Sequence, residues 1–302
     1  MFVLACFSAC VPQVKEPPAP SPFDDNIYSF SEKEDMLPLL DCIYYERDSF
    51  LAAVTSPPTY PVSGEVTAGM LPHHLLASDM IAGLFAATSG DYDQVLIVAP
   101  SHFPENCRSD VVTAMADWKT PFGNISAAQD IVSSILADEL LQADNNPGAV
   151  EYDHGVAGLI PFIKYYYPDA EVAVCLLSNR LSREKRERAV QILGNAAASG
   201  RTLLLASVDC SHYLTPAEAK LRDEETAAAI ESFDYEKIRR FTDSNIDSPQ
   251  TLEVFLRYAE RNGLTLQQFD HSASHHKLPY GISHPIYYEG VTSYFVYAAL
   301  QE

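Results

Sequence analysis

Basic residues are scarce in this sequence, and their scarcity limits the partners that the chain can bind. The 302 residues include 20 Lys and Arg but 41 Asp and Glu, so the formal net charge is -21 at pH 7. A surface with this excess of negative charge repels phosphate groups as they approach. The composition therefore excludes nucleic acid as a partner, and the charge itself is typical of a soluble surface.

Metal-binding cysteine pairs and long apolar runs are missing as well. None of the 6 cysteines forms a CxxC pair, which excludes a structural zinc site made of cysteines alone. Cys175 lies within the apolar run EVAVCLLS, where we expect a small buried side chain without a function. No stretch of 18 apolar residues follows the amino-terminal leader, so we expect the rest of the chain to be soluble.

The amino terminus differs in composition from the rest of the chain. It begins with the apolar run MFVLACFSAC and continues with a proline-rich stretch of linker composition. We expect residues 1–25 to be this leader and linker, and residues 26–302 to form one domain. The leader is similar to the end of a bacterial lipoprotein signal, with Cys10 as the lipidated residue and Cys6 as the alternative. That interpretation predicts a membrane tether outside the cytoplasm, whereas a disordered leader predicts a cytoplasmic protein, and the sequence leaves both open.

Strand and helix patterns alternate along the chain. Four continuous apolar runs are typical of strands buried on both faces, at residues 65–70, 94–99, 171–177 and 202–208. Helical patterns lie between and after them, at residues 78–88, 126–138, 182–198, 223–233, 235–243 and 249–261. Two final strands are expected at residues 264–269 and 291–300. This order predicts a single α/β domain with a mostly parallel central sheet flanked by helices.

Serines stand where several of these helices are expected to begin. Ser78, Ser126 and Ser182 open the first three helical patterns, and Ser248 precedes Pro249 at the start of the last one. A serine hydroxyl can accept a hydrogen bond from a free backbone N–H of the first turn. We therefore expect these serines to cap their helices.

Histidines follow three of the four predicted buried strands. His73 and His74 follow the first, His102 follows the second, and Asp209 and His212 follow the fourth. In an open parallel sheet, the carboxyl ends of the strands border one crevice, so these side chains are expected to converge. Imidazole suits iron, copper, zinc and nickel, and two histidines with one carboxylate leave positions open for substrate or oxygen. The sequence therefore predicts a metal-type site at one edge of the sheet.

Two more segments carry candidate acid–base groups. His154 follows Asp153 before an expected helix and is a candidate general acid or base. Asp209 lies three residues before His212, so it can orient the imidazole or face the pocket, unless it caps the next helix. A hydrolase using Ser101 or Ser211 is disfavoured because neither serine lies in a GxSxG motif. The later histidines are expected on the surface of a polar loop: His271, His275, His276 and His284.

Over residues 60–300 the chain resembles the Memo family, also called protein B of the AmmeMemoRadiSam system. The resemblance is carried by Pro72-His73, by LIVAPSH ending at His102, by Thr120-Pro121-Phe122-Gly123, by Asp153-His154, and by Ser207-Val208-Asp209-Cys210-Ser211-His212. The family's fold is similar to that of class III extradiol dioxygenases. The resemblance therefore implies this kind of fold, together with a metal site.

The resemblance implies that His73 and His102 are metal ligands, as are the first two histidines of the family. The family's third ligand is a cysteine, but no cysteine occurs after Cys210, and Asp247 is the best substitute. If Asp247 does not coordinate, either Asp209 is the next candidate or the site has lost its metal. A site with two histidines and a carboxylate favours iron, or manganese, over copper, and zinc is a further alternative. Ala157 replaces the family's usual glutamate, and His74 begins a segment that departs from its usual glycine-aromatic pair. The family's substrate therefore cannot be carried over.

Two functions are compatible with these residues. The first is a dioxygenase-like, non-haem iron oxidoreductase acting on a small molecule, with His73, His102 and Asp247 holding the metal. In that function His154 and His212, with Asp209 beside them, would transfer protons. The second is a non-catalytic protein that binds a metal or a peptide on the same scaffold. Oxygen consumption with phenolic substrates would discriminate between the two.

Overall fold

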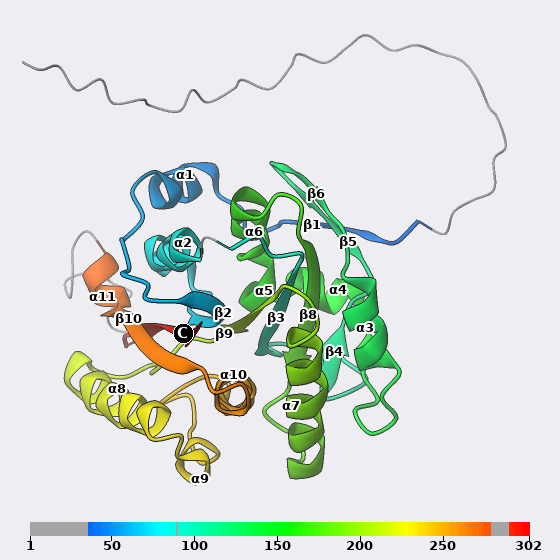
Figure 1. Ribbon diagram of the computed structural model, residues 1–302. Helices are drawn as coiled ribbons and strands as arrows, with labels where there is room; N and C mark the ends of the chain where they lie inside the picture. Colours follow the sequence, from blue (N-terminus) through cyan, green and yellow to red (C-terminus); the bar gives the residue numbers. More distant parts are fainter. Residues whose placement is uncertain (1–35, 89, 279–289) are drawn as a thin grey trace, which may run out of the picture. The chain divides into compact units, whose positions relative to one another are not determined.

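An eight-stranded sheet lies at the centre of the fold, and its strand order decides where the site lies (Figure 1). The computed structural model describes residues 36–88, 90–278 and 290–302, and residues 37–302 form one unit. From one edge to the other the strands are β10 (Thr265–Ala273), β11 (Ser293–Gln301), β2 (Glu65–Leu71), β9 (Thr202–Ser207), β3 (Gln94–Pro100), β8 (Glu171–Leu177), β4 (Val111–Thr113) and β7 (Asp144–Asn145).

The four middle strands of this sheet run parallel to one another. They are β2, β9, β3 and β8, whereas β11 is antiparallel to β2, β10 is antiparallel to β11, and β4 is antiparallel to β8. Because β2, β9 and β3 are neighbours, their carboxyl ends meet at one edge of the sheet. The predicted α/β class, with a mostly parallel central sheet flanked by helices, is confirmed.

The four parallel strands form where the sequence predicted them, with ends that differ by one residue at most. The last two strands differ more: β10 continues to Ala273 instead of ending at residue 269, and β11 begins at Ser293 instead of residue 291. Short strands were not predicted: β4, β7, and a separate three-stranded sheet of β1 (Leu39–Asp41), β5 (Asp117–Thr120) and β6 (Gly123–Ile125). At one edge of the main sheet, β7 has only 2 residues. At the other edge, β10 changes register between Gln268 and Asp270.

Helices cover both faces of the main sheet (Figure 1). One face is covered by α1 (Arg47–Thr55), α2 (Ser78–Ala87), α4 (Pro147–Tyr152), α5 (His154–Ala157) and α6 (Ile160–Tyr166). The other is covered by α3 (Gln129–Leu136), α7 (Arg183–Ala197), α8 (Pro216–Glu231), α9 (Tyr235–Ile238) and α10 (Pro249–Arg261). Shorter elements are α11 (Ser274–Lys277) and the 3-10 turns η1 (Leu75–Ala77) and η2 (Pro104–Asn106).

Each middle strand contributes side chains to both hydrophobic layers. In β3, Ile97 packs in the layer that includes α2 and α6, whereas its neighbour Leu96 packs in the layer that includes α7 and α10. In β9, Leu205 and Leu204 divide in the same way. Alternate side chains of a strand point to opposite faces, so a strand covered on both faces must be apolar at every position. This requirement explains why these strands were visible as continuous apolar runs.

The helix starts agree with the serine prediction in two of four cases. Ser182 accepts a hydrogen bond from the Lys185 N–H, and Ser248 caps α10. The prediction was wrong for Ser78 and Ser126, because the N-cap residues of α2 and α3 are Ala77 and Ala128, which make no side-chain capping hydrogen bond. Helix α8 begins at Pro216 rather than at residue 223. Its start is fixed by Thr215 and Glu218, which form a reciprocal capping box.

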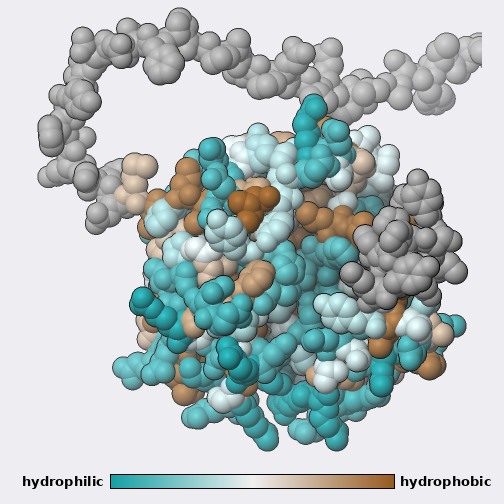
Figure 2. Space-filling view, turned by 180° about the vertical axis from the view of Figure 1, so that it is seen from behind, coloured by the Kyte–Doolittle hydropathy of each residue, from teal (hydrophilic) through white to brown (hydrophobic). Residues whose placement is uncertain are grey.

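Several predictions concern residues outside the described ranges. They include the leader boundary at residue 25, lipidation of Cys10 or Cys6, and the position of His284. Within the described ranges, no helix is both long enough and apolar enough to cross a bilayer. Hydrophilic residues cover most of the face in Figure 2, and the larger hydrophobic areas lie in its upper half.

Candidate metal centre

A cavity of about 570 Å³ opens beyond the carboxyl ends of the middle strands. Its volume lies within the range of about 300–1,000 Å³ that is typical of small-molecule sites. Its lining includes six of the residues that the sequence singled out for the site: His73, His102, His154, Asp209, His212 and Asp247. His74, which was also expected to converge with them, lines a different cavity. The turns after β2, β3 and β9 thus deliver their side chains to one place, while the individual roles of these residues stay predictions.

Three imidazoles form the centre of this site. The ring centroids of His102 and His154 lie 3.8 Å apart, and the His73 ring lies 5.0 Å from His102 and 5.4 Å from His154. Each residue can place one ring nitrogen within 4.8 Å of the other two, so the group could hold a metal ion. His154, which the sequence predicted as a proton-transfer group, therefore lies among the candidate ligands.

Asp153 fixes the orientation and the tautomer of His102. Its carboxylate is fully buried, accepts the His102 backbone N–H at 2.9 Å and lies 2.7 Å from His102 Nδ1. Burial alone would raise the pKa of Asp153, but hydrogen bonds and the charge interaction with His102 hold it below its usual value. The ionised carboxylate holds the imidazole proton on Nδ1 and leaves the Nε2 lone pair free for a metal.

Ser207, at the end of β9, fixes His73 in a similar way. The Ser207 hydroxyl donates to the Gly155 carbonyl oxygen, so Ser207 Oγ accepts the proton of His73 Nδ1 at 3.2 Å. His73 Nε2 therefore carries a lone pair. It lies 3.5 Å from Asp209 Oδ2 and 3.4 Å from Asp247 Oδ2. Three hydrogen-bond acceptors thus gather at one point.

The two carboxylates are themselves held in place by backbone groups. Asp209 Oδ1 accepts the backbone N–H of His73 at 3.1 Å, and Asp247 Oδ2 accepts the backbone N–H of Asp209 at 3.1 Å. The Asn179 side chain donates to the Asp247 carbonyl at 3.0 Å. Burial raises the pKa of Asp247 well above its usual range, and the neighbouring Asp209 carboxylate raises it further. Burial also raises the pKa of Asp209.

The imidazoles are shifted towards their neutral forms. Burial holds the pKa of His73 well below its usual value, and the nearby His102 and His154 rings lower it further. Burial lowers the pKa of His154 and of His212 as well. Neutral imidazoles bind a metal without first releasing a proton, so these shifts favour metal binding near neutral pH.

Buried polar atoms without partners test whether a cation fits. Asp247 and His212 line the cavity, and Asp247 Oδ1 and His212 Nδ1 are buried without a hydrogen-bond partner within the described part of the chain. Unpaired acceptors are costly in a buried site, and mutually facing lone pairs are relieved only by protons or by a cation. The residues present therefore fit a divalent metal ion. Histidine and carboxylate donors suit iron, manganese or zinc.

Two partners of the candidate ligands were not identified from the sequence. Asp153 was named only as part of a motif, and Ser207 was not connected with His73. The sequence does place both residues next to the site, because Ser207 is the last residue of β9 and Asp153 directly precedes His154. Neither signal specifies the partner, because the sequence gives no distance between side chains of different segments.

The polar-loop prediction was wrong for three of its histidines, because His275 and His276 lie in α11 and His271 lies in a strand. His271 lies in β10, and its Nε2 is 2.8 Å from the buried Asp223 carboxylate. The same carboxylate accepts the hydroxyl groups of Ser211 and Ser293 at 3.0 and 2.6 Å. Ser211 is fully buried and already hydrogen-bonded, which agrees with its exclusion as a nucleophile.

The fold and the cluster together define a class: an α/β protein in which two histidines after parallel strands and a third at the start of α5 could hold a metal ion. The sequence comparison identifies the family within that class. Residues 50–282 match the family described as Memo-like protein, and the chain belongs to this family.

Archaeal relatives agree with this assignment. The chain is 26% identical to a MEMO1 family protein of Archaeoglobus fulgidus over 76% of this chain and 89% of the relative. It is 30% identical to a MEMO1 family protein of Methanosarcina mazei over 56% of this chain and 63% of the relative. An uncharacterized Escherichia coli K12 protein of known structure aligns with a TM-score of 0.49 and 14% identity, over 76% of this chain and 98% of that one. A similarity at that level supports no inference about function.

Proposed function

We propose that the protein is a metal-dependent oxidoreductase that acts on a small molecule in the 570 Å³ cavity. One observation carries the proposal: His73 Nε2 lies within 3.5 Å of the carboxylates of the buried Asp209 and the partly buried Asp247, beside two further imidazoles. With both carboxylates ionised, this arrangement is unfavourable, and a cation bound there would relieve it without requiring that either carboxylate take up a proton. The preferred ligands are His73, His102 and Asp247, with His154 as an additional imidazole ligand.

Iron is the metal that we favour. A site of imidazoles with a carboxylate is typical of non-haem iron, and a bound iron would supply Lewis acidity and redox chemistry. Manganese, zinc and copper are the alternatives. The surrounding protein contributes orientation: Ser207 and Asp153 engage Nδ1 of His73 and of His102, which leaves Nε2 of each ring available to a metal.

Asp209 and His212 are the groups that we propose for proton transfer. His212 lines the cavity and its Nδ1 has no hydrogen-bond partner within the described part of the chain, so we assign it the role of accepting a proton from a substrate hydroxyl. Burial lowers the pKa of His212, whereas the negative charge of Asp209 raises it and so favours protonation of the imidazole. The net charge of -21 favours neutral or cationic substrates over anionic ones.

The metal proposal is tested with protein purified without oxygen and reconstituted with ferrous iron. We expect about one metal ion per chain with a Kd near a micromolar, equivalent to about 8 kcal/mol. The double variant His73→Ala/His102→Ala should lose this binding, whereas His276→Ala, which removes an exposed histidine outside the cluster, should retain it. Unchanged iron binding by the double variant would refute the proposal.

Two single variants distinguish the candidate third ligands. Asp247→Asn keeps the shape of the side chain but removes its charge, and His154→Gln keeps a polar side chain without the imidazole. If Asp247 is a ligand, its variant should lose at least about tenfold in affinity, a scale typical of groups that orient or hold a metal. The same comparison for His154 decides whether it is a ligand or only a proton-transfer group.

Turnover is tested separately from metal binding. We expect the iron-loaded protein to consume oxygen with a panel of phenolic substrates, and chromatography would identify the oxidised product. With a catechol as the substrate, the oxygen consumed should be recovered as oxygen atoms incorporated into a ring-opened product. A protein that binds iron but consumes no oxygen would instead be a non-catalytic metal- or peptide-binding protein.

A further inference from the structure

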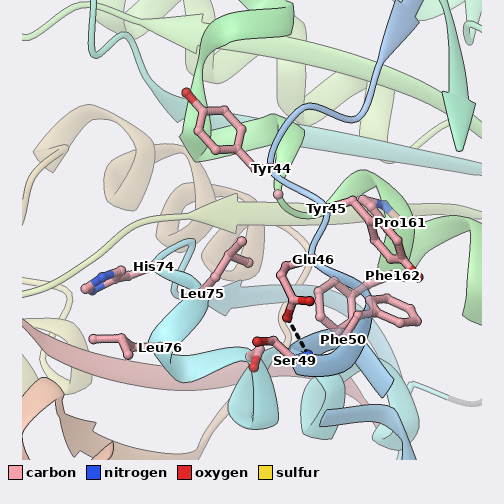
Figure 3. A pocket seen from close by; sticks show the side chains of 12 residues that line it. Tyr44, Tyr45, Glu46, Ser49, Phe50, His74, Leu75, Leu76, Pro161 and Phe162 are labelled. Carbon is pink, nitrogen blue, oxygen red and sulfur yellow. Dashed lines mark hydrogen bonds between the residues drawn. The ribbon is translucent and has the colours of Figure 1, made fainter. Parts of the chain in front are cut away.

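A second cavity lies between α1, η1 and α6 (Figure 3). Its volume is about 320 Å³, and apolar side chains form most of its lining. Figure 3 shows Leu75 and Leu76 on one side and Phe50 and Phe162 on the other, with the Glu46 carboxylate between them. Small-molecule sites have this combination of an apolar lining, a few polar groups and a volume of about 300 Å³ or more.

This cavity is distinct from the candidate metal site. No residue lines both cavities within the described part of the chain. They are neighbours nevertheless, because Tyr44 lines the apolar cavity and its ring meets the His154 ring edge-on at 6.2 Å. A ligand can therefore occupy the apolar cavity without touching the three imidazoles of the metal site.

The walls are built from packed side chains. Phe50 is 3% exposed, and its ring centroid lies 4.6 Å from that of Phe162 and 5.5 Å from that of Tyr45. Gly158 lies behind Leu75, where an added Cβ would come within 3.3 Å of Leu75 Cδ2. The rings are fixed by these contacts, so a ligand would find the aromatic wall already formed.

Glu46 gives the cavity its charge. Of the residues shown in Figure 3, it is the one that carries a full negative charge at neutral pH. Its carboxylate is exposed and accepts the backbone N–H groups of Ser49 at 2.7 Å and Asp48 at 3.1 Å. Hydrogen bonds from Ser49 lower the pKa of Glu46, so the carboxylate stays ionised. The neighbouring Arg47 and Asp48 do not line the cavity.

From the aromatic wall and the fixed carboxylate, we propose that this cavity binds a small aromatic molecule that carries an ammonium group. The ring of such a ligand packs against Phe50 and Phe162, because offset and edge-on aromatic pairs are favourable. Its ammonium group lies near Glu46 and over neighbouring aromatic faces, where ionic and cation–π attraction add. The net charge of -21 disfavours an anion of the same size.

The probe for the test is 2-phenylethylamine, used with the full chain in the presence of a metal chelator. Isothermal titration should give a Kd of about 1 mM or lower, a scale expected for so small a ligand. The neutral 2-phenylethanol should bind more weakly, and the anionic phenylacetate more weakly still. Phenylacetate binding as tight as that of the amine would overturn the proposal.

Two variants locate the binding site. Glu46→Gln should reduce amine affinity by about tenfold, since a charged hydrogen bond is lost, and should leave 2-phenylethanol binding unchanged. Asp48→Asn is the matched control, because it removes a neighbouring charge that does not line the cavity. Leu76→Trp should fill the cavity and abolish binding, whereas Leu140→Trp adds the same side chain at an exposed position elsewhere.

An NMR measurement tests the proposal without depending on whether a variant folds. Intermolecular NMR contacts between the probe and the Phe162 ring should appear in the wild-type chain, which needs no variant at all. The metal-site double variant His73→Ala/His102→Ala should still bind the amine, so a failure of the metal proposal leaves this result intact. Contacts to the metal-site imidazoles in place of Phe162, or amine binding that survives in folded Leu76→Trp, would overturn the proposal.

Discussion

Replacing Asp153 by asparagine should weaken metal binding without disrupting the fold. The two carboxylate oxygens accept three hydrogen bonds, from His102 Nδ1 at 2.7 Å, the His102 backbone at 2.9 Å and the Gly155 backbone at 2.9 Å. Asparagine has one acceptor oxygen and one donor NH2 group, so in either orientation of the amide its NH2 group faces at least one of these N–H donors. When the NH2 group faces His102 Nδ1, the imidazole proton moves to Nε2 and blocks the coordinating nitrogen.

The magnitude follows from the role of Asp153 as a partner of a metal-binding histidine. Loss of such a partner typically costs 10–100-fold in metal affinity, which corresponds to about 1.4–2.8 kcal/mol. Asparagine can still cap a short helix such as α5, so the global fold should be retained. Asp138→Asn is the matched control, since Asp138 is also a buried carboxylate but pairs with Arg188 outside the cavity.

The assay is competition for cobalt(II) or zinc(II) between the protein and a chromophoric chelator at pH 7. Nitrogen-15 NMR of the metal-free protein reports the His102 tautomer directly, which a purely structural effect would leave unchanged. Equal metal affinities for wild-type protein and the Asp153→Asn variant would refute the reasoning. So would a tautomer shift in the Asp138→Asn control.

Three further predictions concern packing, charge and capping. Gly155→Ala would place a Cβ 3.0 Å from Asp153 Oδ1 and 3.1 Å from His102 Cε1. It should lower both metal affinity and the free energy of unfolding, the latter by about 1–3 kcal/mol in urea titrations; unchanged metal affinity would contradict it. Burial raises the pKa of Asp247 in the folded state, so the stability that the protonated carboxyl contributes is lost as pH rises through that pKa. The metal-free Asp247→Asn variant should therefore be more stable than wild type at pH 8, and this advantage should disappear near pH 4. Thermal unfolding at both pH values tests the sign, and excess metal should reverse the order. Thr215→Ala removes the capping box of α8 and should cost about 1 kcal/mol in chemical denaturation, against a smaller effect for the exposed Thr55→Ala.

Continuous burial made the parallel sheet predictable from sequence. The strands β3 and β8 contact helices on both faces, so every position carries the same apolar signal, and the ends of the strands follow from it. Strands of two to four residues, such as β7 and β5, carry no comparable periodicity. Their pairing depends on neighbours that are distant along the chain, and local sequence does not specify such neighbours.

The candidate site was predictable as a set of residues but not as a set of contacts. Parallel topology alone brings the turns of His73, His102 and His212 to one edge, and family resemblance added Asp247. Side-chain geometry then decides which atoms meet: His154 lies close to His102, whereas Asp247 lies beside His73. These distances depend on rotamers and on partners such as Ser207, which sequence patterns do not encode.

Both borders of the main sheet resist addition of another chain. The strand β7 offers only 2 residues for pairing, and the irregular β10 interrupts an otherwise regular row of backbone donors and acceptors. Short or irregular edge strands are a common protection against amyloid-like stacking of exposed backbone. When copies of this protein meet at high concentration, backbone pairing at either border of the main sheet is therefore disfavoured relative to contacts through the helical surfaces.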